Sequence, residues 1–327
     1  MGALLNLALL KLDAAGNYQW SRVYEGDQSS EDAVHGAGAG VGIAEVQTTT
    51  QVPGYALVGR KRISQINQAG VMIRTDINGT PLSNTRYIDG RFGERTMMTF
   101  SDVKFDVDGS LVISGTDTAA NTAGTSRQDP MIMRALSTGA PVFAISYPTA
   151  VAGANPINNG TGDGLDILSN RDITFNGRND LANNSQNLHA FRLTPAGNVL
   201  WMDLFNRSGP GYRSIREDVR GDIAMGGWIG NFPAASSGAL AVLNPAGNPI
   251  LTYKYDFLTK AEGTTPCFAN IGYALAGTVN LPTPPGYGGL DIELIHTNDA
   301  GFVGCLDAPL PSDHSRLPVV PVRWDPV

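Results

Sequence analysis

The sequence has few of the residues that mark redox, metal-binding and membrane-spanning proteins. Its 327 residues include two cysteines and four histidines, and none of them falls in the spacing of a zinc, haem or redox motif. No apolar run approaches the roughly 20 residues that a membrane-spanning helix requires. These shortages exclude the common metal and redox motifs, and they predict no membrane insertion.

Positive charge is scarce as well. The chain has 23 Lys and Arg residues against 30 Asp and Glu residues, a formal net charge of −7, and its basic residues form no stripe. Nucleic acids and anionic membrane surfaces select for clustered basic residues. We therefore expect neither of them as a partner.

Catalytic signatures are missing too. The sequence contains no Gly-x-Ser-x-Gly element of serine hydrolases and no sialidase-type Asp box. Residues 106–110 open like a calcium-binding EF-hand loop, but Asp117 stands where such a loop requires Glu. We interpret this stretch as a hairpin turn, and we assign no catalytic residue and no confident cofactor.

What the sequence does have is a repeat. A tight turn with a glycine joins two strand-like segments six times, and these turn glycines lie 50 to 63 residues apart. The six are Gly16, Gly79, Gly139, Gly197, Gly247 and Gly301. A repeat of this length that contains only short strands is typical of the blades of a β-propeller.

A second glycine recurs at a similar distance before each of the last five turn glycines. It ends a strand-like segment 20 or 24 residues before the turn glycine, at Gly59, Gly115, Gly177, Gly227 and Gly277. Together the two markers predict an all-β propeller of six four-stranded antiparallel blades. In the third repeat we expect strands over residues 100–106, 110–115, 131–136 and 142–147.

Basic side chains recur at one position of the repeat. The fifth residue before the turn glycine is Lys11, Arg74, Arg134, Arg192, Val242 or His296. A ligand seldom needs the same group in every blade, whereas stacked repeats need contacts between neighbours. We therefore interpret these residues as polar ties between strands or between neighbouring blades.

The two ends of the chain are expected to close the ring. Residues 6–10 align with residues 291–295, so the first repeat begins inside its third strand. We assign residues 1–308 to the propeller and residues 309–327 to a segment that completes the first blade or straps the ring. Strands from both termini would remove free sheet edges, and Pro318 and Pro321 suit an edge strand or a strap.

The two cysteines fall in the sixth repeat. Cys267 and Cys305 are expected on its inner and outer strands, where they are either free thiols or a disulfide that staples this blade. A disulfide would imply an oxidising compartment.

Short sequence motifs within the repeats are similar to those of a known family. Residues 11–20 (KLDAAGNYQW) followed by residues 24–26 (YEG), together with GYALVG at 54–59 and GYALAG at 272–277, carry its motifs. The sequence resembles, over residues 3–307, secreted β-propellers common in Bacteroidota that are often cargo of the type IX secretion system. The resemblance implies an extracellular or cell-surface protein whose mature chain has no signal peptide. It also makes Asp117-Thr118-Ala119 a candidate O-glycosylation motif.

Acidic residues recur in the connections between repeats, at Asp32, Glu94, Asp163 and Glu262. In a propeller these connections gather at one mouth of the central channel. Four carboxylates there would offer oxygen ligands to a hard cation such as calcium. The other interpretation is that acidic loop residues simply keep the surface soluble.

Three functions fit these observations. The first is a non-enzymatic scaffold or binding module whose partner is a protein or glycan of a surface assembly. The second is a polysaccharide lyase or hydrolase that uses Glu94 and Asp163 as a carboxylate pair at the channel mouth. The third is a subunit of a virion or filament. A propeller fold does not choose among them.

Overall fold

The computed structural model describes most of the chain and divides it into two compact units. The described residues are 7–24, 42–46, 52–62, 68–89, 97–120, 126–148, 159–180, 186–205, 211–231, 235–255, 260–266, 272–280, 290–301, 303, 307–309, 314–316 and 322–324. Unit 1 comprises residues 1–148 and 322–327, and unit 2 comprises residues 149–321. Over the described residues the protein is all-β, with several sheets and no helix, which confirms the predicted class.

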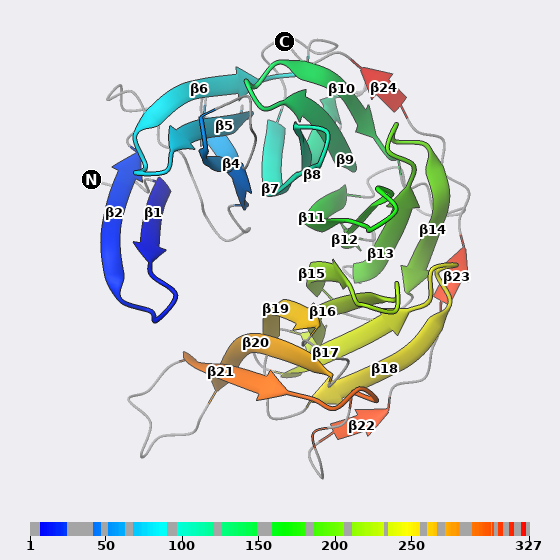
Figure 1. Cartoon of the computed structure of the whole chain (residues 1–327). Helices are drawn as coiled ribbons and strands as arrows, with labels where there is room; N and C mark the ends of the chain where they lie inside the picture. Colours follow the sequence, from blue (N-terminus) through cyan, green and yellow to red (C-terminus); the bar gives the residue numbers. More distant parts are fainter. Residues whose placement is uncertain are drawn as a thin grey trace. The chain divides into compact units, whose positions relative to one another are not determined.

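Unit 1 contains a hairpin and two sets of four antiparallel strands. The hairpin is β1 (Leu7–Leu12) and β2 (Tyr18–Tyr24). The next set is β3 (Ile43–Val46), β4 (Gly54–Arg62), β5 (Gln68–Asp76) and β6 (Pro81–Tyr87). The last set is β7 (Met97–Phe105), β8 (Ser110–Ala120), β9 (Ser126–Leu136) and β10 (Pro141–Ser146). One parallel bridge between Gln68 and Met97 joins the two sets, whose strands are labelled in Figure 1.

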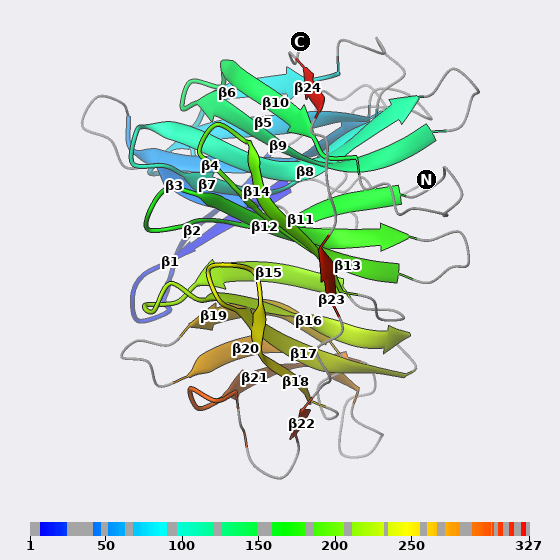
Figure 2. The same ribbon diagram turned by 90° about the vertical axis from the view of Figure 1, so that its right-hand side faces the viewer.

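Unit 2 contains three antiparallel sheets. The first is β11 (Asn159–Ile167), β12 (Ile173–Asp180), β13 (Gln186–Leu193) and β14 (Val199–Phe205). The second is β15 (Gly211–Glu217), β16 (Ile223–Asn231), β17 (Ala235–Leu243) and β18 (Pro249–Tyr255). The third is β19 (Lys260–Pro266), β20 (Tyr273–Asn280) and β21 (Leu290–His296). Figure 2 shows the three sheets as successive layers of this unit.

The six turn glycines share one geometry. Their φ angles lie between 75° and 97°, in the region that favours glycine. The amide N–H of each donates a hydrogen bond of 2.8 to 3.1 Å to the carbonyl three residues earlier. The turns predicted at these glycines are therefore confirmed.

The strands of the third repeat are found where they were expected, but three are longer. β7 begins at Met97, β8 runs to Ala120 and β9 begins at Ser126, beyond the predicted ends at residues 100, 115 and 131. The added stretches of β8 and β9 pair in register, with Thr116 opposite Pro130 and Asp117 opposite Asp129. Main-chain pairing thus continues the ladder through polar residues.

The C-terminal segment adds three short strands to sheets already formed. β22 (Asp307–Pro309) pairs with β18, β23 (His314–Arg316) with β14, and β24 (Val322–Trp324) with β10. Each pairing is antiparallel and lies within one unit. The described residues of this segment thus extend these three sheets at their outer edges, and β1 pairs only with β2.

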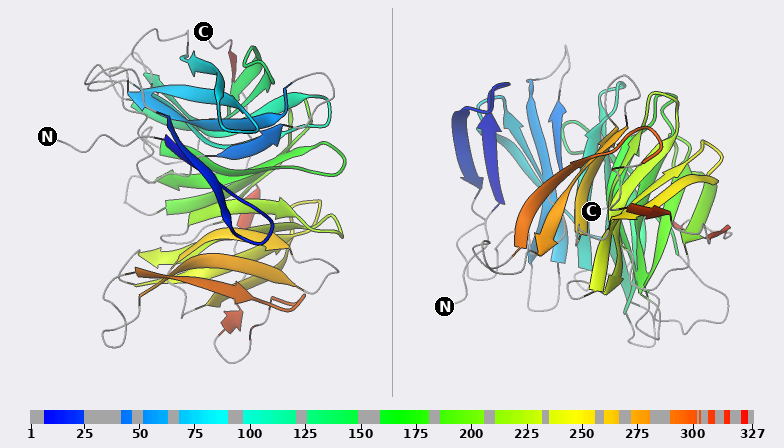
Figure 3. Two further views of the ribbon diagram at one scale, coloured as in Figure 1. Left: turned by 60° about the vertical axis from the view of Figure 1, so that its left-hand side comes forward. Right: turned by 90° about the horizontal axis from the view of Figure 1, so that it is seen from below.

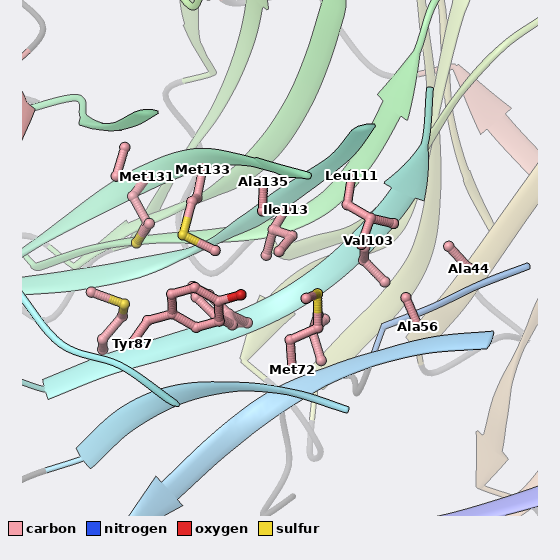
Figure 4. Packing of buried hydrophobic residues seen from close by; sticks show 14 of the residues in the cluster. Ala44, Ala56, Met72, Tyr87, Val103, Leu111, Ile113, Met131, Met133 and Ala135 are labelled. Atoms are coloured by element: carbon pink, nitrogen blue, oxygen red, sulfur yellow. The ribbon is translucent and has the colours of Figure 1, made fainter. Parts of the chain in front are cut away.

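Apolar side chains fill the space between neighbouring sheets. In unit 1, Met72, Tyr87, Val103, Ile113 and Met133 belong to one buried cluster (Figure 4). A second cluster of apolar side chains packs the β1–β2 hairpin against the β3–β6 set. Figure 3 shows the backbone of both from two further sides. Strands covered on both faces explain the near-continuous apolar runs of the sequence.

Candidate functional site

The first strands of four successive four-strand or three-strand sets, β7, β11, β15 and β19, carry a β-bulge at the same place. The register of β7 with β8 shifts between Phe100 and Asp102, and that of β15 with β16 shifts between Tyr212 and Ser214. Equivalent shifts occur in β11, between Gly162 and Leu165, and in β19, between Ala261 and Gly263. A bulge inserts one residue and re-aims a side chain, and such features are enriched next to functional sites.

In unit 2 the bulges fall on charged residues. Asp163 is at the bulge of β11, Arg213 at that of β15 and Glu262 at that of β19, whereas Ser101 has this position in β7 of unit 1. We call Asp163, Arg213 and Glu262 the bulge row. Asp163 and Glu262 were expected in connections between repeats, but both lie inside strands, because main-chain pairing starts earlier than the sequence pattern suggested.

The first two members of the bulge row interact. The Arg213 Nη1 atom lies 3.5 Å from Asp163 Oδ1, and these two side chains are 15% and 9% exposed. The Arg213 guanidinium also lies over the indole of Trp228 from β16, with its Cζ atom 5.5 Å from the ring centroid. A cation between a carboxylate and an aromatic face is held by charge and by a cation–π interaction.

Asn176 fixes the two neighbouring bulges relative to each other. Its side-chain nitrogen donates 2.9 Å to the Ser214 carbonyl, and its side-chain oxygen accepts 2.9 Å from the Gly164 amide. A Cβ atom on Gly164 would lie 2.7 Å from the Arg213 carbonyl oxygen, so only glycine fits here. The sequence did not predict a role for Asn176, Trp228 or Arg213. The one signal that could have indicated Arg213 is that a charged residue stands within a segment that forms a strand.

Buried hydroxyl groups surround the bulge row without a protein partner among the described residues. They are Thr161 Oγ1, Ser214 Oγ, Thr264 Oγ1 and Thr278 Oγ1, and the Arg213 Nε atom shares this state. Ser214 and Thr264 are 8% and 5% exposed. Buried polar atoms are normally satisfied by protein or water, so this region is equipped to bind water or a polar ligand.

His189 is a buried base on β13, close to this region. It is fully buried, and its ring packs edge-on against Phe191 at 5.1 Å between centroids. Burial lowers the pKa of His189 to about 3, and the nearby backbone of Thr161 opposes this effect only partly. The imidazole is therefore neutral at neutral pH.

The calcium site proposed on four carboxylates falls mostly outside the described residues. Asp32 and Glu94 lie outside them, as does the side chain of Glu262. Asp163 is described, and its carboxylate lies 3.5 Å from the guanidinium of Arg213. No group of three or more His, Cys, Asp or Glu side chains within the described part of the chain is placed to hold a metal ion. The calcium site stays a prediction.

Two of the recurrent basic residues tie one sheet to the next, whereas Arg134 binds Asp106 and Asp108 of its own set of strands. Arg74 Nε donates 2.9 Å to the Ser137 carbonyl, and Arg192 Nη1 donates 2.6 Å to the Pro245 carbonyl. Both acceptors precede the next turn glycine by two residues. The structural interpretation is confirmed at these two positions, since each arginine reaches the equivalent atom of the following sheet.

Two further sequence interpretations have an outcome here, and a third falls outside the described residues. The stretch that opens like an EF-hand is a hairpin turn, in which Gly109 N–H donates 3.0 Å to the Asp106 carbonyl. Thr118, in the candidate O-glycosylation motif, is 4% exposed and is thus inaccessible as an acceptor in the folded chain. Cys267 and Cys305 lie outside the described residues.

Among the described residues, no helix is long and apolar enough to cross a membrane. Comparison of the sequence with protein-family models and with curated proteins gave no match.

Proposed function

We propose that the chain is a six-bladed β-propeller that acts as a non-enzymatic scaffold or binding module, outside the cell or on its surface. Its partner is a protein or glycan, bound through the bulge row. Closure of the ring by strands from both ends was expected, but the described C-terminal strands β22, β23 and β24 pair with β18, β14 and β10 rather than with the β1–β2 hairpin. The resemblance of the repeats to secreted propellers supports the extracellular location.

Support for the ring comes from one hydrogen bond that recurs between consecutive sheets. The tyrosine eight residues after a turn glycine donates from its hydroxyl to the carbonyl of the next turn glycine. The pairs are Tyr24 with Gly79 at 2.9 Å, Tyr87 with Gly139 at 2.6 Å, and Tyr255 with Gly301 at 2.7 Å. Neighbouring sheets that are joined by the same contact are related by a similar rotation and translation, as the blades of a propeller are.

The observation that carries the binding function is the bulge row itself. Successive strands of unit 2 have their bulges at equivalent register positions, at Asp163, Arg213 and Glu262. Arg213 is held beside Asp163 and Trp228, and hydroxyl groups without a partner among the described residues lie on the same strands or their neighbours. Such a mixture of charged, aromatic and hydroxyl side chains suits a polar partner, glycan or peptide.

Pull-down of partners tests this function. Tagged wild-type chain is incubated with a surface extract of the source organism, and the captured material is divided between protease and periodate treatment to identify its class. Arg213→Ala should reduce capture about tenfold or more, because one buried charged contact is worth roughly 1.5–3 kcal/mol.

The matched control is Lys104→Ala. It removes a cation from another inner-strand ion pair, in which Lys104 Nζ lies 3.1 Å from Asp102, but it leaves the bulge row intact. Equal capture by wild type and Arg213→Ala would contradict binding through the bulge row, and no capture by either would contradict the binding function.

A subunit of a larger assembly remains the second candidate because of one exposed surface. The hairpin β1–β2 leaves Leu10, Leu12, Tyr18 and Val23 between 47% and 65% exposed. Contiguous exposed apolar side chains mark interaction surfaces. Concentration-dependent sedimentation tests this candidate: self-association that Leu10→Asp abolishes would favour it, and a constant sedimentation coefficient would oppose it.

A further inference from the structure

The C-terminal segment shows how the outer edges of these sheets accept an extra strand. β22, β23 and β24 each contribute three residues, and each pairs antiparallel with the last strand of its sheet. The pairings occupy equivalent places, six to eight residues after the turn glycine in β14 and β18 and five to seven after it in β10. An outer edge of this repeat is therefore able to bind an extended segment.

The added strands have little sequence in common. They read Asp-Ala-Pro, His-Ser-Arg and Val-Arg-Trp. Main-chain hydrogen bonds supply the affinity in strand addition, so the sequence of the added strand is only weakly constrained. The edge requires an extended segment, and the side chains of that segment then determine which sequences bind more tightly.

β6 is built like the covered strands, but its outer edge carries no added strand among the described residues. It follows Gly79 and pairs on one side with β5, and it is the outermost strand of its set (Figure 1). In the covered strand β14, the residue seven after the turn glycine is Leu204, which is 2% exposed. Its equivalent in β6 is Arg86, which is exposed.

The backbone of Arg86 is directed toward this open edge. Tyr87 lies opposite Gly70 on β5, as Tyr147 lies opposite Pro130, where the Tyr147 N–H donates 2.8 Å to the Pro130 carbonyl. Alternate residues of a strand point their N–H groups to opposite sides. The N–H and carbonyl of Arg86 therefore point away from β5, toward an edge that no described strand of the chain covers.

We propose that the outer edge of β6 binds an extended acidic segment of a partner protein by antiparallel strand addition. Arg86 is the one charged residue of β6. In the chain's own strand addition, Arg316 of β23 is paired in register with Asp203 of β14, one residue before the position equivalent to Arg86. An acidic residue opposite Arg86 would form a cross-strand pair of opposite charge.

This inference rests on the proposed binding function and adds a second surface to it, in unit 1. A fluorescent peptide of alternating Asp and Val is titrated into the full chain, and binding is followed by anisotropy. The wild-type chain should bind the Asp-Val peptide. It should bind a peptide of alternating Lys and Val about tenfold more weakly, since repulsion replaces the attraction of one cross-strand charge pair.

Three substitutions at Arg86 separate the contribution of its side-chain charge to binding from that of its main-chain N–H group. Arg86→Ala keeps the N–H and should weaken binding a few-fold, and Arg86→Glu should weaken it further. Arg86→Pro removes the outward N–H, a change that edge strands tolerate, and should weaken binding about tenfold or more relative to Arg86→Ala. Equal affinity of Arg86→Pro and Arg86→Ala would overturn strand addition.

Arg22→Ala is the matched control, because it removes an exposed arginine from β2 without changing the edge of β6. It should bind like wild type, and a loss equal to that of Arg86→Ala would overturn a specific edge. Amide exchange on wild type gives an independent readout. The peptide should slow exchange of the Arg86 N–H, and unchanged exchange at saturation would overturn the proposal.

The peptide result and the pull-down result are independent. No peptide binding, together with Arg213-dependent capture of a partner, would overturn the β6 inference and leave the proposed function standing.

Discussion

The Tyr87 hydroxyl, at the end of β6, donates a 2.6 Å hydrogen bond to the carbonyl of Gly139, which belongs to the turn of the next sheet. Tyr87 is 2% exposed, so this bond is made away from water. It joins the outermost strand of one sheet to the hairpin of another across the buried cluster of unit 1. The same bond recurs at Tyr24 and Tyr255.

Tyr87→Phe should lower the free energy of unfolding by about 1–2 kcal/mol, because it leaves the buried Gly139 carbonyl without its donor. Urea denaturation followed by tryptophan fluorescence measures this change. Tyr18→Phe is the control, since Tyr18 is 65% exposed and its hydroxyl lies 3.3 Å from an exposed serine. An equal effect of the two substitutions would contradict a special role for the recurrent bond.

Arg74→Lys should be destabilising although it keeps the charge. Arg74 is 3% exposed and donates from Nε to the Ser137 carbonyl and from Nη1 to the Tyr55 carbonyl at 2.8 Å. A lysine has one nitrogen and cannot reach both acceptors with this geometry. We expect a loss of about 2–3 kcal/mol in urea denaturation. Arg22→Lys, at an exposed position, should change stability by less than about 0.5 kcal/mol.

Acid should destabilise the protein through His189. Burial lowers the pKa of His189 to about 3 in the folded chain, whereas an unperturbed histidine titrates near 6.5. Between these values the unfolded chain binds a proton that the folded chain does not, so stability falls as the pH drops below about 6.5. The loss should reach about 2 kcal/mol at pH 5.

His189→Met tests this dependence, because the equivalent position in β9 is Met131. Urea denaturation at a series of pH values should show that the variant lacks the acid-dependent loss. His296→Met, at an exposed position, should keep the wild-type dependence. Parallel pH curves for wild type and His189→Met would show that His189 is not the group responsible.

Gly226→Ala should overpack the contact between the second and third sheets of unit 2. A Cβ atom at this position would overlap the Thr264 hydroxyl and lie 2.6 Å from the Thr264 Cβ. We expect a cost of about 1–3 kcal/mol. Combining it with Thr264→Ala should recover part of the loss, and strictly additive effects in the double-mutant cycle would contradict direct packing.

The sequence was sufficient for the features that depend on local chemistry. Turn glycines such as Gly139 have positive φ, a requirement that few other residues meet, so their positions predicted the hairpins. Arg74 and Arg192 recur at one place in the repeat, and this periodicity alone predicted ties between sheets. The all-β class followed from the same repetition.

Features that depend on main-chain pairing were not predictable. The bulge at Arg213 falls among Tyr212 and Ser214, where no apolar alternation marks the register, so the extra residue left no signal. The three-residue strands of the C-terminal segment are too short for any pattern. His189 stands where four of the other repeats have an apolar residue and the sixth has Glu293, and a single histidine in a sequence does not reveal its burial.

Native mass determination of the chain, gently extracted from its source, tests the central claim that it is a binding scaffold. Wild type should be found in a complex heavier than the chain alone, and Arg213→Ala expressed in the same source should be recovered mostly without that partner. Wild type recovered only at the mass of the free chain would contradict the account.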